Sequence, residues 1–168
     1  MNQDPTHRCK MGRNPRPQIP SPKREIKPLV PEVEASLRER LAHNPFVLFM
    51  GVEVPELGEG YARFTLEIRP DFHNSQGFLQ GGVIAALADE AVAYALFSLV
   101  SEGEMISTVE MKINFLAPAQ HGVLEAQAHI RKRGRTLSLG EVEVTQDNRL
   151  VAKGMCTYIH LPPPPQAA

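Results

Sequence analysis

Two kinds of apolar repeat run through the chain, and they predict one buried helix set among several strands. Apolar residues recur at every fourth position in 32–43, after a proline and before an Asn-Pro pair, which predicts a short helix. Between Gly82 and Val100 nearly every residue is apolar and alanine is frequent. A helix that is apolar on all sides is expected to be buried on all sides.

Alternation of apolar and polar residues predicts β-strands on both sides of the long helix. The clearest case is 61–69, where Ala62, Phe64, Leu66 and Ile68 would share one face. A loop is expected over 70–79, and an Asp-Asn turn precedes the last strand. The predicted strands are residues 46–54, 61–69, 108–116, 123–132, 136–145 and 150–160.

Two of these strands also predict which side chains are buried. Residues 108–116 alternate throughout, and their apolar side consists of Val109, Met111, Ile113 and Phe115. Residues 136–145 change phase, so the expected inward side chains are Leu137, Leu139, Val142 and Val144. The change falls at Gly140-Glu141, which predicts a β-bulge there.

The order of elements is helix, two strands, one long helix and four strands, which predicts an α+β fold. Connections of hairpin length imply an antiparallel sheet. A curved sheet of about six strands wrapped around the central helix would cover its apolar surface. This domain is expected over 31–161, after a proline-rich, basic and disordered tail at 1–30 and before a second proline-rich tail at 162–168.

Composition excludes several classes of function. The formal net charge is −1, which argues against a dedicated nucleic-acid binder. No apolar run reaches about 18 residues without a charge, so we expect no membrane-spanning helix, and the N-terminus lacks the apolar core of a signal peptide. The two cysteines indicate free thiols in a reducing cytoplasm. No Cys/His cluster has zinc spacing, so no metal site is expected.

A polar, glycine-rich loop leads into the long helix and suggests chemistry on a carbonyl group. Gly81 and Gly82 would leave backbone N–H groups unobstructed at the positive end of the helix. Asp89 lies in the middle of the helix, and burying a carboxylate costs several kcal/mol unless it is paired. No Lys, Arg or His lies within one turn of it. Glu90 points about 100° away around the helix and is expected to be structural.

The sequence resembles hotdog-fold thioesterases of the phenylacetate-degradation (PaaI-like) type over roughly residues 32–160. The resemblance rests on Asn74-x-x-Gly77-x-x-Gln80-Gly81-Gly82 followed by Leu87-Ala88-Asp89, on the strand from Thr108 to Pro118, and on Arg133-Gly134-Arg135-Thr136. It implies hydrolysis of acyl-CoA thioesters to a free acid and CoA, without a metal or cofactor. It also implies a homodimer or a dimer of dimers with active sites shared between chains.

The resemblance implies roles for individual residues of this motif. Asp89 would be the general base or the nucleophile, and the Gly81 N–H would polarise the carbonyl. Asn74 would position the attacking water or the thioester, and Thr108 would be a secondary orienting residue. Gln80 stands where many such proteins have a histidine. Its amide can donate and accept hydrogen bonds, so it can orient a substrate but cannot act as an acid or base.

Four further residues are candidates for binding substrate. Gly82 and His73 flank the motif, although the glycine could simply permit close packing and the histidine could be an ordinary loop residue. Arg133 and Arg135 belong to the basic stretch 131–135, which is either a solvated hairpin or a contact for the phosphates of CoA.

Two other functions remain open at this stage, and the acyl group is not identified. One is a non-catalytic acyl-CoA sensor, and the other is an enoyl-CoA hydratase, which would use an Asp/His pair. Geometry favours a shared site for hydrolysis. Gly81 and Asp89 are eight residues apart, or about 12 Å along a helix axis, whereas both must lie within roughly 3–3.5 Å of the reacting group.

Overall fold

The computed structural model describes residues 25–101 and 103–162. The predicted N-terminal tail at 1–30 therefore falls mostly outside the described residues, and so does nearly all of the predicted C-terminal tail at 162–168. Residues 25–30 run as irregular chain, and the backbone N–H of Glu59 donates a hydrogen bond to the Lys27 carbonyl.

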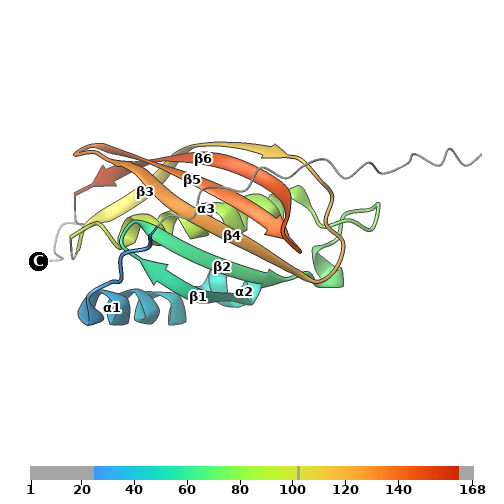
Figure 1. Ribbon diagram of the computed structural model, residues 1–168, viewed down its shortest axis with the longest axis horizontal. Coiled ribbons are helices and arrows are strands. Elements are labelled where there is room, and N and C mark those ends of the chain that lie inside the picture. Colours follow the sequence, from blue (N-terminus) through green and yellow to red (C-terminus); the bar gives the residue numbers. More distant parts are fainter. Residues whose placement is uncertain (1–24, 102, 163–168) are drawn as a thin grey trace, which may run out of the picture.

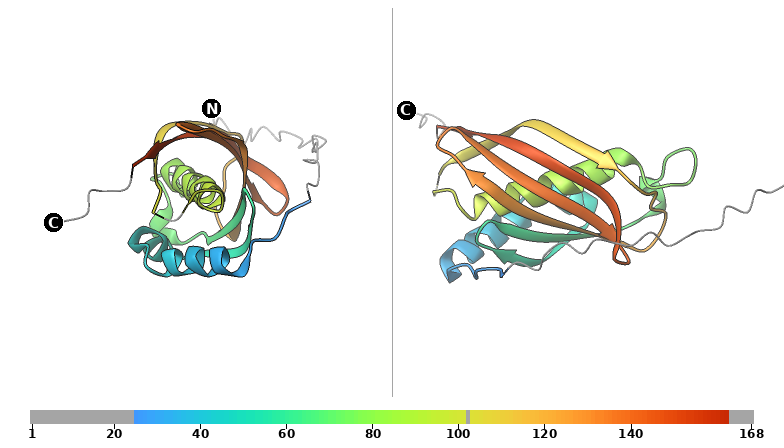
Figure 2. Two further views of the ribbon diagram at one scale, coloured as in Figure 1. Left: turned by 90° about the vertical axis from the view of Figure 1, so that its left-hand side faces the viewer. Right: turned by 45° about the horizontal axis from the view of Figure 1, so that its top comes forward.

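Six antiparallel strands form one curved sheet, in the order β1-β2-β4-β5-β6-β3. Figure 2 shows this sheet wrapped around a single long helix, α3 (Gly81–Phe97), which confirms the predicted α+β architecture. Strands β1 and β3 are the two edges. The strands are β1 (Val52–Gly58), β2 (Tyr61–Glu67), β3 (Met105–Phe115), β4 (Val123–Arg133), β5 (Leu137–Gln146) and β6 (Arg149–Leu161).

Helix α3 is the centre of the core because its side chains are small and apolar. Leu87, Ala88, Ala91 and Val92 are all fully buried. Alanines bring the helix close to the strands that surround it, and the same cluster takes in buried residues from β2, β4, β5 and β6. No helix among the described residues is long and apolar enough to cross a membrane.

The predicted strand at 46–54 is wrong over its first half. The chain there forms a short helix, α2 (Pro45–Met50), which follows α1 (Pro31–Ala42). The side chain of Asn44 accepts hydrogen bonds from the backbone N–H groups of Phe46 and Val47, which caps the helix. Gly51 ends it in the left-handed conformation at φ 71°. This local capping outweighs the apolar run, and β1 begins only after it.

The predicted phase of β5 is also wrong in its first half. The strand keeps one phase throughout, so the buried positions include Ser138 and Gly140, whereas Leu137 is 47% exposed. A Cβ atom on Gly140 would lie 2.3 Å from a methyl carbon of Val92, so only glycine fits between the strand and α3. The register shift lies on β4 instead, between Ile130 and Lys132.

The predicted burial of β3 is not observed. Val109 is 54% exposed and Phe115 is 53% exposed, while Met111 and Ile113 are only partly buried. Val109 lies where the β3–β6 register shifts, between Thr108 and Glu110, and β3 is an edge strand whose one hydrogen-bonded neighbour among the described residues is β6 (Figure 1). Other strand predictions are confirmed, including the buried face of β2 and the turn at Asp147-Asn148, whose φ angles are 49° and 60°.

Candidate active site

The carboxylate of Asp89 is held by two hydroxyl groups from neighbouring strands. The Tyr158 hydroxyl on β6 lies 2.5 Å from Oδ1 and 2.8 Å from the Asp89 backbone carbonyl oxygen. Thr108 on β3 donates to the carboxylate at 3.2 Å from each oxygen. The two strands position these hydroxyls together because Thr108 and Tyr158 are partners in the β3–β6 register.

Tyr158 acts as a donor here because its phenol keeps its proton. Burial and the nearby Asp89 carboxylate raise the pKa of Tyr158. Only 2% of the residue is exposed. Sequence reasoning missed this residue. The sequence did contain a signal, since Tyr158 alternates in phase with the buried side of the predicted strand. A buried phenol hydroxyl needs a hydrogen-bond partner.

Asp89 opens onto a cavity of about 620 Å³ between α1, α3 and the start of β3. One side of it is formed by Asp89, Thr108 and Tyr158. The opposite wall comes from the end of α1, where the Arg40 guanidinium lies 4.2 Å from the centroid of the Phe97 ring. A space of this size next to a carboxylate is suited to a small organic substrate.

A second carboxylate lines the same cavity. Glu90, expected to be structural, accepts a hydrogen bond from the Asn44 side-chain nitrogen at 3.4 Å. Burial and the charge of Asp89 raise the pKa of Glu90, and the Asn44 contact opposes this only in part. Tyr94, one turn further along α3, places its hydroxyl at the same cavity, where it has no hydrogen-bond partner among the described residues.

The glycine motif lies at the other end of α3. Gln80 is the exposed N-cap residue, and its side chain makes no capping hydrogen bond. Gly82 has open space where a Cβ atom would lie, while a Cβ atom on Gly81 would be 3.4 Å from the Phe115 ring. In the part of the chain that the structure describes, neither glycine lines the cavity beside Asp89.

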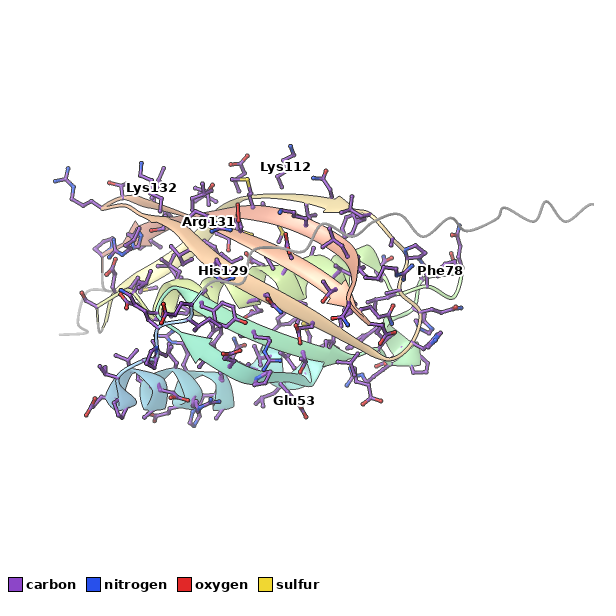
Figure 3. All side chains as sticks on the ribbon, in the orientation of Figure 1. Glu53, Phe78, Lys112, His129, Arg131 and Lys132 are labelled. Carbon is purple, nitrogen blue, oxygen red and sulfur yellow. The ribbon has the colours of Figure 1, made fainter. Side chains whose placement is uncertain are left out.

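Asn74 and His73 organise the loop before α3. The Asn74 side-chain oxygen accepts hydrogen bonds from the backbone N–H groups of Gln76 at 2.9 Å and Phe78 at 3.2 Å. The His73 ring lies 2.8 Å from the Gln120 carbonyl oxygen. These contacts give both residues structural roles in the loop. Figure 3 places Phe78 of the same loop at the end of the molecule opposite the β4–β5 hairpin.

The basic hairpin is partly neutralised by the protein's own carboxylates. Arg133 donates to both carboxylate oxygens of Glu104, at 2.9 and 3.0 Å, and Arg131 pairs with Glu141. Figure 3 shows Arg131 and Lys132, which both lie on β4 close to this turn. Lys132 and Arg135 are exposed and have no charged partner among the described residues. They are therefore the cations free to meet an anionic ligand.

A polar cluster links this hairpin to the start of β3. The His160 ring contacts Glu104 through one nitrogen, and its other nitrogen lies 2.7 Å from the buried Ser138 hydroxyl. Burial opposes ionisation of Glu104, but hydrogen bonds from the Ser101 N–H and His160, together with Arg133, lower its pKa below the ordinary value. This cluster braces three strands and does not reach the cavity.

The structure thus brings together two of the predicted site residues, Asp89 and Thr108, and leaves the others at a distance within one chain. Gly81, Gln80 and Asn74 lie at the N-terminal end of α3, and the hairpin arginines lie outside the cavity. No group of three or more His, Cys, Asp or Glu side chains placed to hold a metal occurs within 25–101 and 103–162.

Comparison with known proteins places this arrangement in a family. The sequence model described as "Thioesterase superfamily" matches residues 76–153. A Mycobacterium tuberculosis protein named as an esterase is 31% identical over 114 residues, which are 66% of this chain and 81% of that protein. The 1,4-dihydroxy-2-naphthoyl-CoA hydrolase of Listeria monocytogenes is 28% identical over 64% of this chain and 89% of its own.

A solved structure shows the same fold. The phenylacetic acid degradation-related protein of Ralstonia eutropha superimposes with a TM-score of 0.69 and 28% sequence identity. The match covers 76% of this chain and 98% of the other. The resemblance to hotdog thioesterases of the phenylacetate-degradation type, and the fold that it implied, are confirmed.

Proposed function

The chain belongs to the thioesterase superfamily, and from this premise we propose that it hydrolyses acyl-CoA thioesters to a free acid and CoA. One observation carries the proposal: the Asp89 carboxylate, held by Tyr158 and Thr108, faces a cavity of about 620 Å³. The named activity of the Listeria relative, a CoA-thioester hydrolase, supports the same class of substrate.

Asp89 supplies the reactive oxygen of the proposed reaction. Its Oδ1 is shared between Tyr158 and Thr108, whereas Oδ2 receives only Thr108 among the described residues. Oδ2 is therefore the freer atom to take a proton from water or to attack the carbonyl carbon. Both routes need an ionised carboxylate, and hydrogen bonds from two hydroxyls stabilise that form.

The carbonyl oxygen would be held by the Gly81 N–H of a second chain. We propose a homodimer, alone or as a dimer of dimers, in which each site combines Asp89 of one chain with Gly81, Gln80 and Asn74 of its partner. Two observations support this. The separation of Gly81 and Asp89 along α3 is about 12 Å. The edge strand β3 exposes unpaired backbone groups and apolar side chains such as Val109.

CoA itself would be bound by the hairpin and the loop. Lys132 and Arg135 are the free cations for its phosphates, with Arg133 fixed nearby by Glu104. Gly82 and His73 would line the path of the substrate. The reaction as proposed needs neither metal nor cofactor, and the two-cysteine composition favours a reducing cytoplasm as its compartment.

Replacing Asp89 tests the proposal. Asp89→Asn keeps the size of the side chain and removes its charge, so we expect an unchanged melting temperature and a kcat at least about a hundredfold lower. The measurement is colourimetric release of free thiol from a panel of acyl-CoA thioesters. Asp147→Asn is a matched control, because Asn tolerates the left-handed turn conformation at that exposed position.

The same assay separates the alternatives. An enoyl-CoA hydratase would add water to its substrate without releasing thiol, and an acyl-CoA sensor would bind without turnover. Failure of the wild type to release thiol from any acyl-CoA in the panel would contradict the proposed function. A folded Asp89→Asn variant that keeps most of its kcat would remove Asp89 from the mechanism.

A further inference from the structure

Two carboxylates, Asp89 and Glu90, line one cavity but have different surroundings. We propose that Glu90 is a second catalytic group, the general acid that gives its proton to the sulfur atom of the departing thiol. This inference rests on the proposed thioester hydrolysis and adds a residue to it. When neighbouring titratable groups are driven apart by their environments, the pair can divide acid and base roles.

The Asp89 carboxylate is held by two hydroxyl donors. Tyr158 and Thr108 direct O–H donors at its oxygens, and an anion accepts such bonds more strongly than a neutral acid does. The sheet fixes both donors, since they lie on adjacent strands. Asp89 is therefore equipped for the role of base or nucleophile.

The Glu90 surroundings favour a protonated group. It is partly buried, it lies next to the charge of Asp89, and its one hydrogen-bond donor among the described residues is an amide nitrogen at 3.4 Å. Burial is the main reason that the pKa of Glu90 is raised. The remaining titratable side chains of the cavity are Glu39, Arg40 and His43 on α1 and its end, Tyr94 on α3, and Tyr158 on β6.

Asn44 holds Glu90 in position, and Tyr94 lies on the same side of the helix. The Asn44 oxygen is used to cap α2, so the side-chain nitrogen of the same amide is turned toward Glu90. Tyr94 lies four residues further along α3 and so shares the Glu90 face of the helix. Its buried hydroxyl has no partner among the described residues and remains available for a substrate atom or a water beside Glu90.

The sulfur of the leaving group needs the Glu90 proton because a thiolate anion is a poor leaving group in this cavity. A thiol with a pKa of about 8.5 departs as an anion unless it is protonated, and the anion would form close to the carboxylates. In the step, a C–O bond forms to the attacking oxygen and the C–S bond breaks. The bonding electrons go to sulfur, and sulfur takes the Glu90 proton.

The protons are accounted for whether Asp89 acts as the base or as the nucleophile. If Asp89 acts as base, it holds the proton of the attacking water and returns it to Glu90 through solvent after the acid leaves. If Asp89 is the nucleophile, it is tied up in an anhydride and has no proton to give. Glu90 then protonates the thiol, and the water that opens the anhydride restores its proton. The products are a carboxylic acid and a neutral thiol.

The test compares two thioesters of the same acyl group, the one hydrolysed best in the acyl-CoA panel. One has an N-acetylcysteamine leaving group, an alkyl thiol that needs protonation, and the other a nitrothiophenol, which leaves readily as an anion. Glu90→Gln should lower kcat for the alkyl thioester at least about tenfold and for the aryl thioester less than threefold. The ratio of the two rates does not depend on how much protein is folded.

Two further variants serve as controls for Glu90→Gln. Glu90→Asp keeps an acid at the position and should leave the ratio near that of the wild type. Glu32→Gln, on the exposed first turn of α1, makes the same chemical change outside the cavity and should not alter it. Equal losses on both thioesters for Glu90→Gln would overturn the inference while leaving hydrolysis by Asp89 intact. An inactive wild type would instead defeat the proposed function itself.

Discussion

Asp89 has hydroxyl partners because of where two residues fall in a strand register, and this makes Tyr158 a positioning residue for the proposed reaction. Tyr158 does not react; it holds one oxygen of the carboxylate in place from 2.5 Å. A hydrogen bond to a charged group contributes about 1.5–3 kcal/mol. Removing the hydroxyl should therefore lower the rate of the proposed reaction.

We predict that Tyr158→Phe lowers kcat about ten- to a hundredfold and changes KM by less than about threefold, because a hydrogen bond of about 1.5–3 kcal/mol to the reactive carboxylate is lost. The measurement is the rate of thiol release as a function of acyl-CoA concentration. Tyr61→Phe is the matched control, because Tyr61 is equally buried but lies on the outer face of the sheet near Glu56. A Tyr158→Phe variant with a kcat within about threefold of the wild type would refute the role.

At the scale of single residues, the sequence could identify Asp89 and Thr108 but not their partners. A carboxylate on an apolar helix is conspicuous in any sequence, since its burial is costly. Glu90 shares this signal, and Tyr158 is in phase with the buried side of its strand, but neither observation identifies a partner. Their roles depend on the β3–β6 register and on the seating of Asn44 against α3, and both are products of the folded chain.

At the scale of elements, periodicity predicted the long helix and most strands, and it was wrong where one local interaction decided the outcome. The Asn44 cap and the following proline turn an apolar run into α2. In β5 the apolar residues Leu137 and Leu139 looked like inward positions. The inward positions are Ser138 and Gly140, because α3 passes too close for a larger side chain at Gly140. Neither contact can be read from the period of the sequence.

The close approach of α3 and β5 gives a prediction about stability. Gly140→Ala should lower the free energy of unfolding by about 1–3 kcal/mol, because the new methyl group would lie 2.3 Å from a methyl carbon of Val92. In a Val92→Ala background the same change should cost distinctly less, since the obstructing methyl groups are gone. Urea unfolding of the two single variants and the double variant measures the coupling.

Gly82, at the start of α3, provides a control for this comparison of single and double variants. Gly82 has open space around the position of an added Cβ atom, so Gly82→Ala should be neutral or stabilising by up to about 1 kcal/mol. If the costs of Gly140→Ala were the same with and without Val92, the packing explanation for the phase of β5 would be wrong.

At the scale of the whole molecule, β3 shows why the burial pattern of one chain can mislead. Val109 and Phe115 follow the alternation of a buried face, yet about half of each is exposed. The proposed dimer resolves the conflict, because a partner on the free edge of β3 would cover them. The alternation in the sequence then reflects the assembly and not the single domain. Gly81 packs near Phe115, so the same region would join the two parts of each site.

The shared site predicts rescue of activity between two inactive chains. Asp89→Asn removes the carboxylate, and Gly81→Val crowds the N–H group that would hold the carbonyl oxygen. If each site takes Asp89 from one chain and Gly81 from the other, a mixed dimer contains one site with both native residues. Random pairing makes half the dimers mixed, and half of their sites are intact, so co-expression should restore about a quarter of wild-type activity.

Two measurements make this outcome decisive. Differently tagged chains, purified through both tags in sequence, isolate the mixed dimer, whose activity should approach half that of the wild type. Each variant alone must be inactive and must still form dimers, as judged by its mass in solution. A pure mixed dimer without activity would show that each chain supplies its own complete site. A wild-type chain that is active as a monomer would show the same, since the 12 Å between Gly81 and Asp89 would then have to be closed within one chain.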